Sequence, residues 1–355
     1  MRRIGWLVLV PALVVLASGC DWNWTMFHSG PDHSGNNSGE ASISQSNVGS
    51  LGIKWSYATG GGAGSGSPAV VNGVVYAGSA DTKVYALNAR TGAVQWSYAT
   101  VGAVKSSPAV ANGVVYVGSD DSQLYPSNGH VYALNASTGA LQWSYTTGGS
   151  VWSSPVVVNG VVYVGSNDGD VYALNASTGA LQWSIATGGS VISSPAVANG
   201  VVYVGSLDRK VYALNASTGA VQWTFSAGKE VLSSPAVANG KVYVGSEDRN
   251  VYALDASTGA LQWAYTTGGF VESSPAVANG VVYVGSGDRK VYGLSVGSGA
   301  LLWSSTTGGV VGPSSPAVAN GVVYVGSEDH KLYAFGLPPV LHVVERMGPG
   351  AVLPS

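Results

Sequence analysis

The sequence predicts an all-β fold, a seven-bladed β-propeller with four-stranded blades, from its composition, a repeated unit and the two ends of the repeat region. Of 355 residues, 51 are glycine and 10% are aromatic, whereas 9% are charged. A typical soluble domain carries about 25% charged residues. With 46% hydrophobic residues the chain is not a charge-rich disordered segment, and no Gly-X-Y period marks collagen. A net charge of −3 provides no general attraction to nucleic acid.

A repeated unit occurs seven times between residues 51 and 336. Each full unit contains Ser-Pro, then Val-Val-Tyr-Val-Gly-Ser, then Val-Tyr-Ala-Leu, and ends near Gly-Ala-Leu-Gln-Trp or a variant of these. A period of roughly 40 residues is typical of propellers and solenoids. The tryptophans that mark the unit are Trp55, Trp96, Trp143, Trp183, Trp223, Trp263 and Trp303.

Each unit is expected to form four short strands. Ser-Ser-Pro-Ala-Val-Ala starts the first strand, and the Asn-Gly that follows is the strongest two-residue hairpin signal, since both turn residues need positive φ. Val-Val-Tyr-Val-Gly-Ser forms the second strand, and a turn containing Asp leads to Val-Tyr-Ala-Leu as the third. Asn-Ala-Ser-Thr-Gly then turns into the fourth strand, which carries the tryptophan. Valine, tyrosine and tryptophan favour strands, and no stretch shows a helical period.

The two ends of the repeat region are complementary. Residues 51–59 resemble a fourth strand, whereas residues 330–335 resemble a third strand. We therefore expect the N-terminal strand to pair into the last blade and close the ring, which leaves only short sheet edges. A solenoid that never closes is the rival architecture, and the complementary ends argue against it.

Residues 1–20 are predicted to be a bacterial lipoprotein signal peptide. A positively charged start precedes an apolar run from Ile4 to Ala17, which is shorter than the roughly 20 residues of a spanning helix. The run ends in Leu-Ala-Ser-Gly-Cys, which resembles the bacterial lipobox and implies lipidation of Cys20 and anchoring on the outer side of a bacterial membrane. An ordinary signal peptide or an uncleaved anchor is the alternative. Residues 21–50 form a polar leader, and residues 337–355 form a tail without a repeat match.

The recurring Ala-Leu-Asn-Ala-Ser-Thr-Gly-Ala-Leu-Gln-Trp, seen at 133–143 and 173–183, resembles the tryptophan-docking repeat of quinoprotein propellers. Residues 24–39 are also similar to the segment that precedes such propellers in exported bacterial proteins. The resemblance covers residues 24–336 and implies that the seven tryptophans lock neighbouring blades together. The family includes dehydrogenases that bind pyrroloquinoline quinone (PQQ), and non-catalytic lipoproteins such as the propeller subunit of the outer-membrane β-barrel assembly machinery.

Differences between the repeats gather on one face of the predicted ring. The loops before Ser-Ser-Pro and the turns after Val-Gly-Ser share this face, which we call face one. The Asn-Gly hairpins and Asn-Ala-Ser-Thr-Gly turns lie on the opposite face and hardly vary. Because the first strand is innermost, the variable residues just before Ser-Ser-Pro are expected to ring the central channel; they are Lys105, Trp152, Ile192, Leu232 and Glu272, with Pro313 in the last unit.

The turns farther out on face one repeat Asp-Arg, and they contribute Arg209, Arg249 and Arg289. In one interpretation the aspartate caps a tight turn and the basic side chains are solvated tips. In the other, face one is a mixed apolar and charged surface that binds a protein partner, with Trp152 as an aromatic anchor. The favoured function is therefore a non-catalytic, monomeric, membrane-anchored scaffold that binds a protein of the cell envelope.

A PQQ-dependent dehydrogenase of small alcohols or sugars is the alternative function. Such a site would need Ca²⁺ held by carboxylate and amide oxygens together with a catalytic aspartate, and the resemblance also implies an adjacent Cys-Cys disulfide. Cys20 is the only cysteine, and Asn167-Asp168-Gly169-Asp170 matches a calcium loop only faintly. The five histidines form no metal-ligand pair on one element. We therefore expect no catalytic residue, cofactor or metal, with PQQ and Ca²⁺ kept as the alternative.

Overall fold

The computed structural model describes residues 27, 30, 33, 53–61, 66–122, 128–312, 314–319 and 321–336. This part of the chain forms twenty-seven β-strands and contains no helix. It accordingly holds no helix long and apolar enough to cross a membrane. The predicted signal peptide with Cys20, most of the leader, Pro313 and the tail lie outside the described residues.

The strands form seven antiparallel sheets in chain order, six with four strands and one with three. The first three sheets contain β1 (Ala69–Val71), β2 (Val74–Ser79), β3 (Lys83–Asn88) and β4 (Val94–Ala99); β5 (Ala109–Ala111), β6 (Val114–Asp120), β7 (Gly129–Asn135) and β8 (Leu141–Thr147); β9 (Val156–Val158), β10 (Val161–Gly165), β11 (Asp170–Asn175) and β12 (Leu181–Ala186). The next three contain β13 (Ala196–Ala198), β14 (Val201–Gly205), β15 (Lys210–Asn215) and β16 (Val221–Ser226); β17 (Ala236–Ala238), β18 (Lys241–Gly245), β19 (Asn250–Asp255) and β20 (Leu261–Thr266); β21 (Ala276–Ala278), β22 (Val281–Ser286), β23 (Lys290–Ser295) and β24 (Leu301–Thr306). The seventh contains β25 (Ala317–Ala319), β26 (Val322–Ser327) and β27 (Lys331–Phe335).

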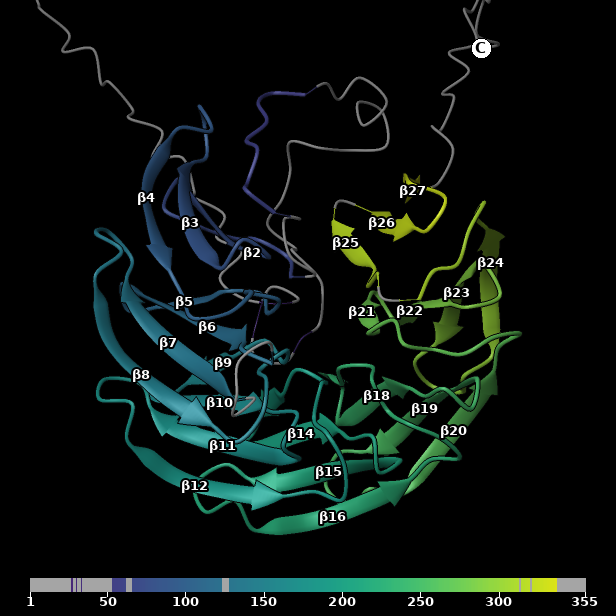
Figure 1. Ribbon diagram of the computed structural model, residues 1–355. Coiled ribbons are helices and arrows are strands. Elements are labelled where there is room, and N and C mark those ends of the chain that lie inside the picture. The colour runs from purple at the N-terminus through teal and green to yellow at the C-terminus, as the bar shows by residue number, and fades with distance from the viewer. Residues whose placement is uncertain are drawn as a thin grey trace, which may run out of the picture.

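The sheets follow one another around a common centre (Figure 1), with the first strand of each sheet innermost and the fourth outermost. Inner strands of consecutive sheets contact each other, as β5 does β9 and β17 does β21. This arrangement confirms the predicted seven-bladed propeller.

Local sequence explains each blade, and the third sheet is representative. Asn159 and Gly160 both have positive φ, 51° and 77°, which gives the tight hairpin between β9 and β10. The middle strands of this sheet read as continuous apolar runs because the sheets on either side cover both of its faces, and Val171 to Leu174 are all buried. On the outermost strand β12, Leu181 is exposed whereas Trp183 is buried.

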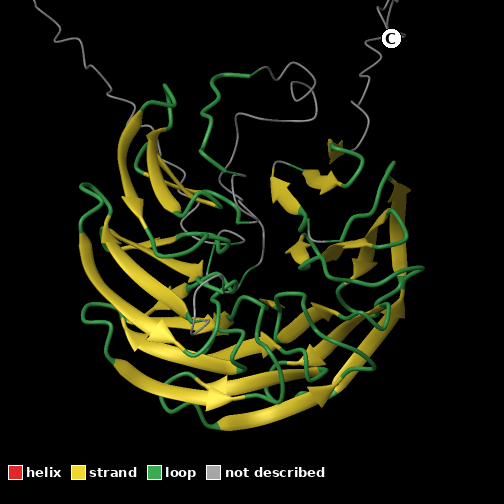
Figure 2. Ribbon diagram, in the orientation of Figure 1, coloured by secondary structure: helices red, strands yellow, loops and turns green. Residues whose placement is uncertain are grey.

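The expected closing strand is the part of the prediction that the structure corrects. Residues 53–59 form no strand, and β26 is the one described strand that pairs with β27. Trp55 instead donates its Nε1–H to the carbonyl oxygen of Ala89 in the first sheet, at 2.9 Å. The described part of the segment is thus positioned by its tryptophan on the first sheet and is drawn as loop (Figure 2), and none of the described strands joins the first sheet to the seventh.

Candidate functional site

Tryptophan docking connects consecutive sheets. Trp143 on β8 donates its Nε1–H to the carbonyl oxygen of Ala176, at 2.9 Å, in the turn after β11. Its ring lies so close to Gly179 that a Cβ on this glycine would be 2.7 Å from the indole. The same bond joins Trp55 to Ala89, Trp96 to Ala136, Trp183 to Ala216, Trp223 to Ala256 and Trp263 to Val296.

Trp303 is placed differently from the other six tryptophans. It packs against Phe335 with ring centroids 5.0 Å apart and keeps 36% of its surface exposed. The seventh unit carries no Asn-Ala-Ser-Thr-Gly turn after Gly336, so the chain does not supply the usual turn on which this indole would dock. A cavity of about 450 Å³ lies here between the sixth and seventh sheets.

A ladder of serine hydrogen bonds surrounds the channel, and the sequence did not reveal it. In each Ser-Ser-Pro, the hydroxyl of the second serine accepts a hydrogen bond from a backbone N–H in the preceding unit; Ser107 N to Ser154 Oγ is 2.9 Å. The first serine accepts from its own sheet, as Ser153 does from Gly165 N at 3.0 Å. The other rungs run from Ser67 to Ser107, Ser154 to Ser194, Ser194 to Ser234, Ser234 to Ser274 and Ser274 to Ser315. The doubled serine was visible in the sequence, but the backbone N–H that bonds to its second hydroxyl belongs to the preceding unit.

The aspartates of face one are structural. Asp208 Oδ2 accepts from the Tyr212 hydroxyl and from Gly188 N in the preceding loop, while Oδ1 accepts from Lys210 N. Burial acts to raise the pKa of Asp208, but the hydrogen bonds from Tyr212, Ser206 and the backbone outweigh it and lower the pKa. Asp208 therefore caps its turn, which is the first of the two interpretations of these aspartates.

Arg209, Arg249 and Arg289 lie at the exposed tips of these turns, next to the aspartates. Their φ values of 73°, 76° and 69° are in the left-handed region, which non-glycine residues seldom adopt. Arg209 Nε lies 3.6 Å from Glu230 Oε1. None of the three arginines lines the cavity formed by the inner variable residues.

The five inner variable residues come together. Lys105, Trp152, Ile192, Leu232 and Glu272 all line one cavity of about 290 Å³, together with second serines of the ladder. These residues come from consecutive units, and each stands just before the Ser-Ser-Pro that leads into an innermost strand, so the cavity is the face-one end of the central channel. We call it the mouth.

One side of the mouth carries a fixed cation. Lys105 Nζ lies 2.6 Å from Asp120 Oδ2 and 4.1 Å from the centroid of the Trp152 ring, a cation–π arrangement. Burial acts to raise the pKa of Asp120, but the hydrogen bonds from Lys105, Ser150 and Ser122 outweigh it and hold the pKa well below its usual range. Trp152 is thereby held beside the channel with 37% of its surface exposed.

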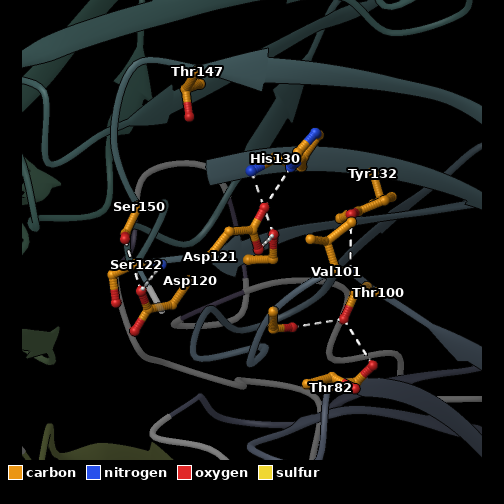
Figure 3. Close-up of polar contacts among 12 residues, drawn as sticks. Thr82, Thr100, Val101, Asp120, Asp121, Ser122, His130, Tyr132, Thr147 and Ser150 are labelled. Atoms are coloured by element: carbon orange, nitrogen blue, oxygen red, sulfur yellow. Dashed lines mark hydrogen bonds and ion pairs between the residues drawn. The ribbon is translucent and has the colours of Figure 1, made fainter. Parts of the chain in front are cut away.

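The second unit is longer than the others because residues 121–130 carry an insertion, and Asp120, the partner of Lys105, directly precedes it (Figure 3). Asp120 Oδ1 accepts a hydrogen bond from the Ser150 hydroxyl at 2.7 Å. The next residue, Asp121, accepts from Ser119 Oγ at 2.7 Å and pairs with His130 Nδ1. Asp120 and Asp121 are both buried, and the pair between Asp121 and His130 joins the two ends of the insertion. The sequence showed the insertion but not the contact that joins its ends.

The opposite side of the mouth carries Glu272. Burial raises the pKa of this carboxyl group, and the negative charges of Glu247 and Glu328 raise it further. Between Glu272 and Lys105 the lining is apolar at Ile192 and Leu232.

The residues of the mouth do not fit a calcium–quinone centre. Ca²⁺ takes about six to eight oxygen ligands, and of the described residues that line the mouth only Glu272 is a carboxylate. Within the described ranges no three His, Cys, Asp or Glu residues are grouped to hold a metal ion. The loop at 167–170 is an ordinary turn, in which Asp168 accepts from the Tyr172 hydroxyl and from Asp170 N.

Solved structures share the fold at low sequence identity. BamB from Moraxella catarrhalis is 22% identical, with a TM-score of 0.65, over 78% of this chain and 84% of that one. The quinohemoprotein alcohol dehydrogenase ADHIIG from Pseudomonas putida HK5 is 20% identical, with a TM-score of 0.77, over 89% and 71%. A europium-containing methanol dehydrogenase is 16% identical, with a TM-score of 0.74, over 89% and 86%.

No curated protein matches the chain. The family model described as outer membrane protein assembly factor BamB matches residues 36–150, 127–234 and 210–337. Together these overlapping matches cover the whole of the repeat region. The chain therefore belongs to the BamB family of PQQ-like propeller repeat proteins.

Proposed function

We propose that the protein is a non-catalytic scaffold of the bacterial cell envelope that binds a protein partner through the mouth. The observation that carries this proposal is the convergence of the variable residues of consecutive units on one cavity, while the repeated residues are engaged in bonds between and within sheets. The family description, an outer membrane assembly factor, agrees with a role in a protein complex. Lipidation of Cys20 on the outer side of the membrane is part of the proposal.

The chemistry of face one suits protein binding. Interface residues that contribute most to affinity are enriched in Trp, Tyr and Arg and lie near the centre of the contact. Trp152 is central and partly exposed, and Ile192 and Leu232 add apolar surface beside it. The arginines of the face-one turns occupy left-handed positions, where a glycine, such as Gly169 in the third unit, would be unstrained. The turn itself gives no reason for arginine, so a role in contact accounts for it better.

Site-specific photo-crosslinking in the native membrane tests the proposal. A photoreactive amino acid at Ile192 should crosslink to a defined envelope protein, whereas the same group at Leu181, exposed on the outermost strand β12, should not. Trp152→Ala should reduce the yield from Ile192, and Leu181→Ala should leave it unchanged. Equal products at both positions would contradict the proposal.

One observation favours the dehydrogenase as a second candidate. Glu272 is a partly buried carboxyl group with a raised pKa that faces the mouth, which is a property of general bases. Purified protein incubated with PQQ and Ca²⁺ distinguishes the two functions. Retained quinone absorbance together with Glu272-dependent dye reduction would favour the dehydrogenase, and the scaffold proposal expects neither.

A further inference from the structure

Part of the N-terminal leader is seated in the mouth. Phe27 lines the same cavity as Trp152, Ile192 and Leu232, although it precedes the first strand of the propeller by about forty residues. His33 is 1% exposed. A polar leader that only connected an anchor to the propeller would be expected to stay in water.

A local turn brings the two aromatic rings together. His33 N donates to the carbonyl oxygen of Gly30 at 3.0 Å, and His33 has a φ of 54°. The His33 ring meets the Phe27 ring edge to face, with centroids 5.2 Å apart and planes at 88°. The leader therefore carries a compact aromatic pair, of which Phe27 lines the mouth.

The chemistry of the mouth matches this pair. The Trp152 indole, held by Lys105, and the apolar side chains of Ile192 and Leu232 offer Phe27 an aromatic and aliphatic seat. Phe27 and His33 belong to no strand. Removal of Phe27 from the mouth, together with the turn that carries His33, would therefore break no sheet.

We propose that the leader turn carrying Phe27 and His33 is a built-in peptide ligand of the mouth, and that the mouth is a receptor for peptide segments that present an aromatic side chain. A segment tethered to its receptor has a high effective concentration, so the leader competes with any such segment supplied by another protein. The competition with a partner rests on the proposed function; the binding of the leader does not.

Binding of the leader in trans tests the proposal on the full-length protein. The probe is a fluorescently labelled peptide of residues 24–36, followed by anisotropy. The Phe27→Ala/His33→Ala variant should bind this peptide at least about tenfold more tightly than the wild type, whose mouth is already filled. A peptide with Phe27→Ala should bind the variant at least about tenfold more weakly than the native peptide. Equal binding to wild type and variant, or of the two peptides, would overturn the proposal.

Two further variants locate the binding. Trp152→Ala added to the double variant should abolish peptide binding, whereas Val221→Ala, exposed on the outermost strand β16, should leave it unchanged. If Val221→Ala abolished binding as Trp152→Ala does, the mouth would not be the receptor. Should the double variant fail to fold, Phe27→Ala alone gives the same comparison.

Crosslinking separates this inference from the proposed function. Emptying the mouth with Phe27→Ala/His33→Ala should raise the crosslinking yield from Ile192 several-fold, and a lower yield would overturn the competition. If the peptide binds in trans but no envelope protein crosslinks, the proposed function fails and the built-in ligand stands. If crosslinks form and the peptide does not bind, the reverse holds.

Discussion

Replacing Gly179 by alanine tests whether tryptophan docking holds the sheets together. Gly179 has a φ of 73°, and a Cβ there would lie 2.7 Å from Cδ2 and Cε3 of Trp143. Real Cβ atoms essentially never approach other atoms so closely. The methyl group fits only if the indole moves, and this movement disturbs the 2.9 Å hydrogen bond from Trp143 Nε1 to the carbonyl oxygen of Ala176.

Gly160→Ala is the matched control. Gly160 has a φ of 77° but nothing within 4 Å of its Cβ position, so alanine there costs only left-handed strain, about 1–2 kcal/mol. Gly179→Ala adds the overpacking against Trp143, about 1–3 kcal/mol, and the lost hydrogen bond, about 1 kcal/mol. We therefore expect Gly179→Ala to be less stable than Gly160→Ala by about 2–4 kcal/mol.

Urea unfolding followed by tryptophan fluorescence and circular dichroism measures this difference. Coincident transitions and an unchanged m value would justify linear extrapolation of the free energy of unfolding. In a Trp143→Ala background, Gly179→Ala should cost no more than Gly160→Ala, since the ring is gone. Equal losses for the two glycine variants in the wild-type background would refute the docking argument.

Three other predictions follow from the bonds described above. Ser154→Ala removes the acceptor of the buried Ser107 N–H and should lower the free energy of unfolding by about 1–3 kcal/mol, measured by urea unfolding. Ser177→Ala, in an exposed turn, should change it by no more than about 0.5 kcal/mol. Similar losses for the two variants would mean that the ladder adds no stability. Burial and a carboxylate partner raise the pKa of Tyr212 to about 12. The contribution of Tyr212 to stability should therefore be intact below about pH 10, the pKa of tyrosine in the unfolded chain, and be lost as the pH rises through 12. Tyr212→Phe should lose less stability over this interval, and a dependence of stability on pH equal to that of the wild type would contradict the assignment. Lys105→Met removes the strongest hydrogen-bond donor that lowers the pKa of Asp120. A depressed carboxyl pKa stabilises the fold above the unfolded pKa, and this stabilisation is lost as the pH falls through the folded pKa. The variant should therefore unfold at a higher pH than the wild type on acid titration, and an unchanged acid midpoint would contradict the role of Lys105.

The fold was predictable because its signals are local and repeated. Asn159-Gly160 specifies one hairpin by its own backbone preference, and the same pair recurs in other units. The position of the inner variable residues followed from strand direction alone. The mouth could therefore be anticipated before any contact was known, and Lys105, Trp152, Ile192, Leu232 and Glu272 do line one cavity.

Other features depend on partners far away in the sequence. Trp55 lies in a segment that resembles a fourth strand and also has the docking indole. The sequence alone could not decide between backbone pairing of this segment with β27 and docking of the Trp55 side chain on Ala89. The structure shows the docking. The seat of Phe27 was equally hidden, because a short leader has no repeat against which to compare it. The serine ladder was predictable only in part. Its residues were conspicuous in the sequence, but each hydrogen bond joins one unit to the next.

The framework also explains why face one can carry function without loss of stability. In most units the docking tryptophan, the doubled serine and the turn aspartate are engaged in hydrogen bonds with neighbouring residues, as Trp143, Ser154 and Asp208 show. A change at any of them disturbs a contact on which the sheet or its neighbour depends. The residue just before Ser-Ser-Pro faces the channel, where Ile192 or Leu232 can stand in place of Trp152 while the serine bonds on either side keep the same length. Variation is thus tolerated where the channel opens, and a binding surface can diverge there while the propeller stays the same.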